Sequence, residues 1–309
     1  MDDSEPLWCD VAVGEDDQAP ATIQWGRYEG IGMETEHLAY NEAHWDEVAD
    51  LHRLSYEAES LVNDPNRLSD IVVDDARLMA PFLPDGSVEG LDVIHLQCHI
   101  GTDTLSWARM GARMTGVDLS GESLRIARDL ADRAGLEIEY VQSSIHDAAA
   151  ALAGRSYDVV YTSIGVLYWL DDLDEWARLI AGILRPGGIF FIREGHPMAM
   201  SIDPLTPKGE LKLGWPYFNC GPQVDESDVD YSSPEKVGNA RTFGWSHPLG
   251  EIIVSLINAG LRITDFQEHQ TLPWSLFDWM DYSEELHAHV LPEPLRNLCP
   301  LAFSLVAQH

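Results

Sequence analysis

The feature that most constrains this chain is a regular alternation of apolar and amphipathic segments between residues 91 and 193. Five segments have the length and composition of buried strands: 91–96, 113–117, 138–141, 157–162 and 189–193. Three segments between them have the periodicity of helices: 102–110, 121–134 and 172–184. Strands and helices that alternate in this way form right-handed βαβ units, so the pattern predicts a parallel sheet with helices on both faces. Ligands of such sheets bind at the carboxyl ends of the strands.

The residues before this unit predict a separate helical region. Residues 1–25 are acidic, contain Gly and Pro, and are expected to be mobile. Residues 26–90 are expected to form an N-terminal helical cap, with one helix over 34–62 and a second over 69–79 that Ser69 or Asp70 caps. The first helix has apolar residues at three- and four-residue steps: Leu38, Trp45, Val48, Leu51 and Leu54.

Residues 91–309 are expected to form the core, with one long interruption. Residues 197–246 are rich in Pro, Gly and Asp and contain several Trp, Tyr and Phe residues, which predicts an aromatic lid. A helix over 248–259 follows, and 261–266 and 301–306 are expected to pair as a hairpin at the sheet edge.

Composition limits the partners of the chain. Its 309 residues contain 52 Asp and Glu against 19 Lys and Arg, which gives a net charge of −33. A surface of this sign repels a phosphate backbone, so no nucleic-acid partner is expected. The sequence contains no apolar run of the roughly 20 residues that a membrane-spanning helix needs. Its N-terminus also lacks the basic segment followed by an apolar one that is typical of a signal peptide. We therefore expect a cytoplasmic protein with no membrane partner, and the sequence leaves open whether it is a homo-oligomer.

The spacing of the cysteines favours neither a disulfide framework nor a zinc site. None of the four forms a C-x-x-C pair: Cys9, Cys98, Cys220 and Cys299. His95, Cys98 and His99 alternate sides along a strand and loop, so they are not expected to converge on a metal. An acidic run over 171–175 opens a predicted helix and is interpreted as N-capping and as complementing the helix dipole, with no catalytic role.

The loop after the first strand points to a nucleotide-like ligand. It connects the strand over 91–96 to a helix N-terminus, and Asp118 ends the next strand about 20 residues later, where a carboxylate can accept both hydroxyls of a ribose. A dinucleotide enzyme needs G-x-G-x-x-G here so that a pyrophosphate can approach bare backbone. This loop has only Gly101, with Gln97 and His99 at other positions, which favours a cofactor without phosphate, such as S-adenosylmethionine.

From His95 to Glu194 the chain resembles the class I S-adenosylmethionine-dependent methyltransferases. Residues 95–101, His-Leu-Gln-Cys-His-Ile-Gly, stand where the family has D-x-G-x-G-x-G. The other matching segments are Gly-Val-Asp-Leu-Ser at 116–120, Tyr-Asp-Val-Val-Tyr at 157–161, Leu-Tyr-Trp-Leu at 167–170 and Leu-Arg-Pro-Gly-Gly at 184–188. The chain is most similar to actinobacterial-type small-molecule methyltransferases with an HLQCHxG first motif, an Arg-Glu-Gly-His-Pro turn (193–197) and a Trp-x-His-Pro segment (245–248).

The resemblance implies a Rossmann-like methyltransferase fold. That fold is α/β, with a mostly parallel seven-stranded sheet, helices on both faces, the N-terminal cap and the insertion after the fifth strand. The cofactor would be S-adenosyl-L-methionine. The implied cofactor-binding residues are Tyr40, Gln97, His99, Gly101, Asp118, Leu119, Ser144, Ile145 and Ser163. His95 replaces the usual first acid of the family, and Ser144 stands where an Asp often meets the adenine amine.

The resemblance places the methyl acceptor near the ends of the fourth and fifth strands. The implied substrate-binding residues are Tyr28, Tyr168, Trp169, Glu194 and His247. His196 is the candidate general base, because an imidazole titrates in the working range. Two other interpretations stay open: His196 hydrogen-bonds the turn backbone, and His247 caps the following helix. An amine acceptor would need no dedicated base.

The function expected from these features is methyl transfer to nitrogen or oxygen of a small organic molecule, such as a natural product. Two alternatives from other classes stay open. One is a non-catalytic protein that keeps the fold, which the altered first motif favours. The other is an NAD-dependent oxidoreductase, which the missing glycines disfavour.

Overall fold

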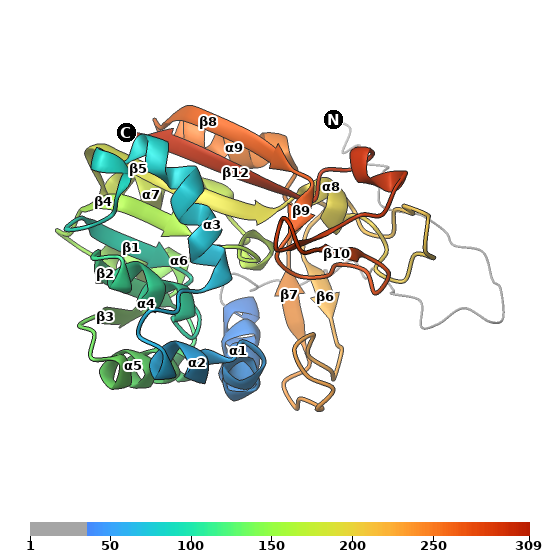
Figure 1. Ribbon diagram of the computed structural model, residues 1–309, viewed down its shortest axis with the longest axis horizontal. Coiled ribbons are helices and arrows are strands. Elements are labelled where there is room, and N and C mark those ends of the chain that lie inside the picture. The colour runs from blue at the N-terminus through green and yellow to red at the C-terminus, as the bar shows by residue number, and fades with distance from the viewer. Residues whose placement is uncertain (1–35) are drawn as a thin grey trace, which may run out of the picture.

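The computed structural model describes residues 36–309, which are built around one seven-stranded sheet (Figure 1). The strand order is β3-β2-β1-β4-β5-β12-β8. The strands are β1 (Asp92–Leu96), β2 (Arg113–Asp118), β3 (Glu139–Gln142), β4 (Tyr157–Thr162), β5 (Leu184–Gly195), β8 (Arg262–His269) and β12 (Ala302–Gln308). Strands β1 to β5 are parallel, and β12 is antiparallel to both of its neighbours, β5 and β8. The mostly parallel seven-stranded sheet is therefore confirmed.

Helices cover both faces of the sheet. On one face lie α3 (Asp70–Met79), α4 (Thr102–Arg109) and α5 (Gly121–Ala134), and on the other α6 (Ile145–Ala151), α7 (Leu173–Ile183) and α9 (Leu249–Asn258). Each face has its own apolar core, because side chains alternate across every strand. Phe190 packs with Trp176 of α7 on one face, whereas Phe191 packs with Trp107 of α4 on the other.

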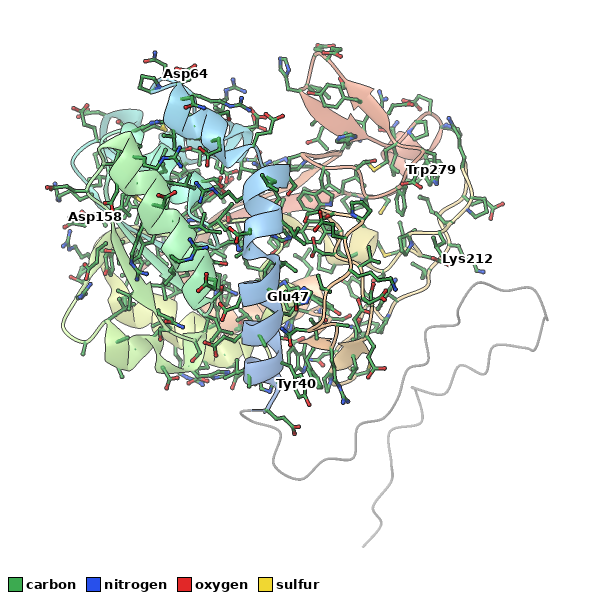
Figure 2. All side chains as sticks on the ribbon, turned by 90° about the horizontal axis from the view of Figure 1, so that it is seen from below. Tyr40, Glu47, Asp64, Asp158, Lys212 and Trp279 are labelled. Carbon is green, nitrogen blue, oxygen red and sulfur yellow. The ribbon has the colours of Figure 1, made fainter. Side chains whose placement is uncertain are left out.

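The N-terminal helical segment differs from its prediction. Instead of one helix there are two, α1 (Glu36–Ser55) and α2 (Ala58–Asn63), separated at Glu57, whose φ is 48°. The predicted apolar face is also wrong in part, since Leu54 is 74% exposed. The residues that α1 buries are mostly polar: His37, Asn41, His44, Val48, Ala49 and His52. In Figure 2, α1 stands between the core and the later insertions. Its polar side chains bond to both: Asn41 and His52 to the insertion, and His52 also to His99 of the core.

The chain beyond β5 forms two small sheets past the carboxyl ends of the parallel strands (Figure 1). After the short helix α8 (Pro197–Met200), β6 (Gln223–Asp225) pairs with β7 (Thr242–Gly244). Between β8 and β12 a three-stranded sheet forms from β9 (Thr271–Leu272), β10 (Asp281–Ser283) and β11 (Ala288–Val290). The sequence predicted neither this sheet nor α6. It predicted the pairing of the last two strands correctly, although β12 lies inside the sheet and β8 alone of the two is an edge strand.

The remaining elements are 3-10 helices that shape connections. They are η1 (Ala80–Phe82), η2 (Pro84–Gly86), η3 (Leu167–Trp169) and η4 (Leu295–Asn297). Among residues 36–309, every helix is too short or too polar to cross a bilayer.

A buried ion pair fastens α3 to the sheet. Asp75 of α3 is fully buried, where it accepts hydrogen bonds from the Arg193 guanidinium of β5 and from the Tyr161 hydroxyl of β4, the latter at 2.6 Å. Arg193 also donates to the carbonyl of Ile71 at 3.1 Å. Burial raises the pKa of Asp75 to about 6, although the Arg193 charge and the Tyr161 hydroxyl act in the opposite direction.

Replacing Asp75 with Ala should strongly destabilise the protein. The change leaves the Arg193 charge buried without its main partner, and such losses cost about 3–5 kcal/mol of unfolding free energy. Urea unfolding of Asp75→Ala should report this loss. The matched control is Asp74→Ala, since Asp74 is partly exposed and lies 3.9 Å from Arg193. Equal stability of the two variants would contradict the assigned role of Asp75.

Candidate functional site

The loop between β1 and α4 has an unusual backbone at the carboxyl edge of the sheet. Gln97, His99 and Gly101 have φ values of 57°, 50° and 75°. L side chains disfavour this left-handed region by roughly 1–2 kcal/mol per residue, so the conformation is one that glycines adopt at little cost. The chain therefore keeps a glycine-type backbone at alternate positions but carries side chains at two of them.

Asp118 at the end of β2 holds this loop in place. Its Oδ2 accepts from the backbone N–H of His99 at 2.7 Å, and its Oδ1 accepts from the N–H of Ser120 at 2.9 Å. Burial raises the pKa of Asp118 to about 6, and the backbone donors of Ser120 and His99 partly offset that effect. Each carboxylate oxygen can accept a second hydrogen bond, so the group still has capacity for a ligand.

Gln97 brings an acceptor without a partner to the same place. Its Nε2 donates to the carbonyl of Val166 at 3.3 Å, which ties the loop to the chain after β4. Its Oε1 is buried and accepts no hydrogen bond within the described part of the chain. Buried acceptors are rarely left without a donor, and a bound ligand is one common explanation. This amide oxygen and the Asp118 carboxylate together form a set of acceptors at one edge.

His95, which stands in place of the family's first acid, is a neutral bridge inside the core. Its Nδ1 lies 2.9 Å from Thr104 Oγ1 of α4, and its Nε2 lies 3.0 Å from Ser163 Oγ after β4. Burial lowers the pKa of His95 to about 3, so the ring stays uncharged at neutral pH. His95 thus joins β1, α4 and the end of β4 without adding a buried charge.

The His99 side chain belongs to a chain of hydrogen bonds that leads away from the sheet. Its Nδ1 lies 3.1 Å from Ser123 Oγ, and its Nε2 lies 2.7 Å from Nδ1 of His52 on α1. His52 Nε2 in turn lies 2.9 Å from Asp230 Oδ1 in the connection between β6 and β7. Although burial alone would raise the pKa of Asp230, hydrogen bonds from His52 and Ser232 lower it to about 2.

The carboxylate orients every proton in this chain of hydrogen bonds. An ionised Asp230 can only accept, so His52 donates from Nε2, and when its ring is neutral it accepts at Nδ1. His99 must then donate from Nε2, and it accepts from the Ser123 hydroxyl at Nδ1. Burial is the main cause that lowers the pKa of His99 to about 3, consistent with a neutral ring. The roles of His52 and Asp230 were not predicted from the sequence, although the spacing of His37, His44 and His52 along one helix is a signal for them.

An aromatic cluster lies against the loop. The ring of Trp45 on α1 packs edge-on against His99 and Trp169, with centroid distances of 5.1 and 4.9 Å. Trp169 also contacts Tyr168 at 5.3 Å. The Tyr168 ring covers Gly244 of β7 so closely that a Cβ there would lie 2.0 Å from it. The cluster therefore joins α1, η3 and the β6–β7 hairpin above the carboxyl edge.

Glu194, predicted to contact substrate, has both carboxylate oxygens hydrogen-bonded to backbone N–H groups. Its carboxylate accepts from the N–H groups of Gly165, Val166, Leu167 and Gly195, at 2.7, 2.9, 3.1 and 2.7 Å. These bonds fix the segment that carries Tyr168 and Trp169. Its contribution to the site is therefore to position that segment.

His196 and His247 also make structural contacts. Nδ1 of His196 accepts from the N–H of Met198 at 3.1 Å and caps α8, while its Nε2 lies 3.1 Å from Glu268 Oε1. This matches the turn-backbone interpretation, and a base role, which stays a prediction, would require the capping bond to break. His247 does not cap α9, since Pro248 occupies that position; instead its Nε2 donates to the carbonyl of Leu170 at 2.8 Å.

The other predicted residues surround the same edge. The ring of Tyr40 on α1 lies 5.6 Å from that of Phe243, and the Arg241 guanidinium lies over it at 5.5 Å from its centroid. Ser144 caps α6 by accepting from the N–H of Asp147 at 3.1 Å, and the buried Ile145 follows it. The carbonyl of Leu119 accepts from Gln142 at 3.2 Å. Tyr28 and the acidic segment 1–25 lie outside the described residues.

Comparisons with known proteins agree with this architecture. Residues 91–192 match the model of a family described as a methyltransferase domain. The fold is similar to that of an S-adenosylmethionine-dependent methyltransferase from Mesorhizobium loti, with a TM-score of 0.54, 21% identity, and coverage of 77% of this chain and 100% of that one. A magnesium protoporphyrin IX methyltransferase from Synechocystis, with bound S-adenosylhomocysteine, gives a TM-score of 0.53 and 13% identity over 89% of this chain and 100% of that one. The Rossmann-like methyltransferase fold is therefore confirmed.

Sequence similarity to curated proteins covers part of the chain. The chain is 37% identical over 121 residues to a ubiquinone biosynthesis O-methyltransferase of Escherichia coli O7:K1, covering 38% of this chain and 50% of the relative. It is 30% identical over 126 residues to the protein of the same name from Methylobacterium sp., covering 41% and 49%. The chain thus spans about half the length of the curated relatives that it matches.

The neutral state of His95 predicts a specific dependence of stability on pH. The folded pKa, about 3, is below the ordinary value of 6.5, so the stabilisation from His95 is complete above pH 6.5 and is lost as the pH falls toward 3. His95→Gln keeps a hydrogen-bonding group but cannot be protonated. Below pH 6, the unfolding free energy of the variant relative to that of the wild type should rise by up to about 1.4 kcal/mol for each unit that the pH falls. Above pH 7.5 the difference between the two unfolding free energies should be constant.

The measurement is denaturant unfolding of both proteins from pH 4 to 8. Comparing the difference cancels the opposite effect of Asp75 and Asp118, whose raised pKa values act equally in both. His309→Gln, at the exposed end of the chain, is the control for removing a histidine. A difference in unfolding free energy that does not change with pH would contradict the prediction, because it would mean that His95 binds a proton as readily in the folded protein as in the unfolded chain.

Removing the carboxylate of Asp230 should loosen the β1–α4 loop at a distance. Asp230→Ala deletes the acceptor that orients His52 and, through it, His99, which should cost about 1.5–3 kcal/mol of unfolding free energy. Hydrogen exchange of the amides in 97–101 should speed up. Asp228→Ala is the matched control, because its carboxylate is half exposed and forms an ion pair with Lys236 at the surface. Unchanged exchange in the loop would refute the coupling.

Proposed function

We propose that this chain is an S-adenosylmethionine-dependent methyltransferase that acts on nitrogen or oxygen of a small organic molecule. The observation that carries the proposal is the glycine-type loop at Gln97, His99 and Gly101, held by Asp118 at the carboxyl edge of β1 and β2. The match of residues 91–192 to the methyltransferase domain supports it.

The acceptors at this edge suit the cofactor. The free capacity of Asp118 would serve the two ribose hydroxyls, and the unpaired Oε1 of Gln97 would accept from the ammonium of the methionine part. Ser144 and Ile145, at the start of α6, would lie on the adenine side, with Leu119 and Ser163 nearby. Because the loop offers no row of glycines for a pyrophosphate, S-adenosylmethionine fits it better than NAD.

When bound, the cofactor supplies a methyl group already activated by the sulfonium, so the protein mainly has to align the acceptor and exclude water. The rings of Trp45, Tyr168 and Trp169 provide an apolar wall at the carboxyl edge. Helix α1 and residues 197–246 would form the cap and the lid that close this space. Such walls favour flat or apolar acceptors.

The acceptor atom and any proton transfer are part of the proposal. Relatives named as O-methyltransferases support oxygen. His196 is retained as the candidate base, with its Nδ1 lone pair released from Met198 in the working complex. The net charge of −33 disfavours a nucleic-acid substrate.

Calorimetric titration with S-adenosylmethionine and S-adenosylhomocysteine, with NADH as the control ligand, tests the proposal. One site is expected for both sulfur ligands and none for NADH. Asp118→Ala should weaken binding at least tenfold, since hydrogen bonds to a charged group contribute about 1.5–3 kcal/mol. Asp174→Ala, an exposed carboxylate on α7, should bind like the wild type.

The titration also separates the alternatives. If the folded wild-type protein bound neither sulfur ligand, the result would contradict the proposed methyltransferase activity and favour a non-catalytic protein with this fold. Binding of NADH instead would favour the oxidoreductase. Asp118→Asn, which keeps the shape of the side chain, guards against a loss that comes only from a disordered loop.

A further inference from the structure

A cluster of two histidines and one carboxylate lies beside the carboxyl edge of the sheet. His37 comes from α1, His146 from α6, and Asp171 from the turn before α7. One potential ligand atom from each residue lies within 4.8 Å of the other two. His37 Nε2 lies 3.3 Å from Asp171 Oδ2, and His146 Nε2 lies 2.9 Å from Asp171 Oδ1.

These separations suit a four-coordinate metal ion. Ligand atoms at about 2.0–2.1 Å from a tetrahedral Zn²⁺ are about 3.3 Å apart. The two oxygens of Asp171 lie 3.3 and 2.9 Å from the two imidazole nitrogens, so the carboxylate is already close to this separation from both rings. Two imidazole nitrogens and one carboxylate oxygen form a donor set that divalent transition metals prefer.

A second carboxylate orients one of the rings. Glu175 hydrogen-bonds Nδ1 of His146, which leaves Nε2 on the side of Asp171. Histidines that bind a metal usually donate their other nitrogen to a carboxylate in this way, which fixes the tautomer of the ring. The sequence analysis interpreted the acidic run as helix capping, but only Asp172 serves as the cap of α7, by accepting from the N–H of Glu175 at 2.8 Å.

Burial and access also fit a bound ion. His37 is 5% exposed, whereas the side chains of His146 and Asp171 are 27% and 23% exposed, so the cluster is sheltered but reachable. His146 and Glu175 line a hollow between α6 and α7 that opens to solvent. The net charge of −33 would concentrate cations near such a site.

We propose that His37, His146 and Asp171 bind one divalent transition-metal ion of the Zn²⁺ type, with Glu175 as a positioning residue. The ion would leave a fourth position for water and would fasten the start of α1 to α6 and α7. Because Ser144 and Ile145 directly precede His146, it would also stabilise the side of the edge assigned to adenine. The metal site itself does not rest on the proposed methyl transfer.

The test is calorimetric titration of the full chain, freed of metal with a chelator, with Zn²⁺ alone. One site is expected, and Co²⁺ in its place should give the visible absorption of a four-coordinate ion. His146→Gln should weaken Zn²⁺ binding at least 100-fold. Glu175→Gln, which keeps a hydrogen-bond acceptor, should weaken it about 10- to 100-fold. His289→Gln in β11, which removes a histidine from a different sheet, should bind like the wild type.

Two results would overturn the site. One is Zn²⁺ binding that is weak, multiple and equal in wild type and His146→Gln, which would mean adventitious binding by the acidic surface. The other is an unchanged thermal midpoint with saturating Zn²⁺, which would mean that no ion fastens α1. Circular dichroism of each variant excludes misfolding. The Zn²⁺ titration contains no S-adenosylmethionine, so a failure to bind Zn²⁺ does not bear on the proposed methyl transfer. Binding of S-adenosylmethionine by His146→Gln tests the cofactor site separately.

Discussion

The carboxylate of Glu194 is the interaction on which the geometry of the candidate site depends most. It is buried at the end of β5 and accepts four backbone N–H groups, three of them in the turn that follows β4. Burial raises the pKa of Glu194, and the four donors act against that rise. Without this acceptor, the N–H groups of the buried residues Val166, Leu167 and Gly195 would be unsatisfied, each at a cost of about 1–3 kcal/mol.

The turn held by Glu194 in turn positions much of the insertion. The carbonyl of Tyr168 accepts from the N–H of Trp245 at 2.7 Å, and the carbonyl of Leu170 accepts from the His247 ring. The β6–β7 hairpin and the start of α9 are therefore set relative to the sheet by backbone carbonyls of one turn. A charge inside the sheet thus determines where an outer layer of aromatic side chains lies.

Helix α1 depends on polar contacts in a similar way. Asn41 exchanges two hydrogen bonds of 2.9 Å with the backbone of Phe243, so it extends the edge of β7. Glu47 accepts from the N–H groups of Gly238 and Asn239, and His52 joins Asp230. These contacts cross from the core to the insertion, as the position of Tyr40 and Glu47 along α1 in Figure 2 illustrates. An amphipathic helix placed by apolar contacts alone would have buried Leu54, which is exposed instead.

The sequence by itself determined the central sheet, because period-two and period-3.6 patterns of burial are local and strong between residues 91 and 193. It also identified the β1–α4 loop and Asp118, since their chemistry is carried by residues close in the chain. Only the tertiary structure decided that Gln97 and His99 adopt the backbone of glycines, and that Glu194 binds backbone groups. It alone brought His99 to His52 and Asp230, and His37 to His146 and Asp171. His99 and His52 are 47 positions apart, and His52 and Asp230 are 178 apart. A polar side chain gives no local signal of which distant partner will satisfy it.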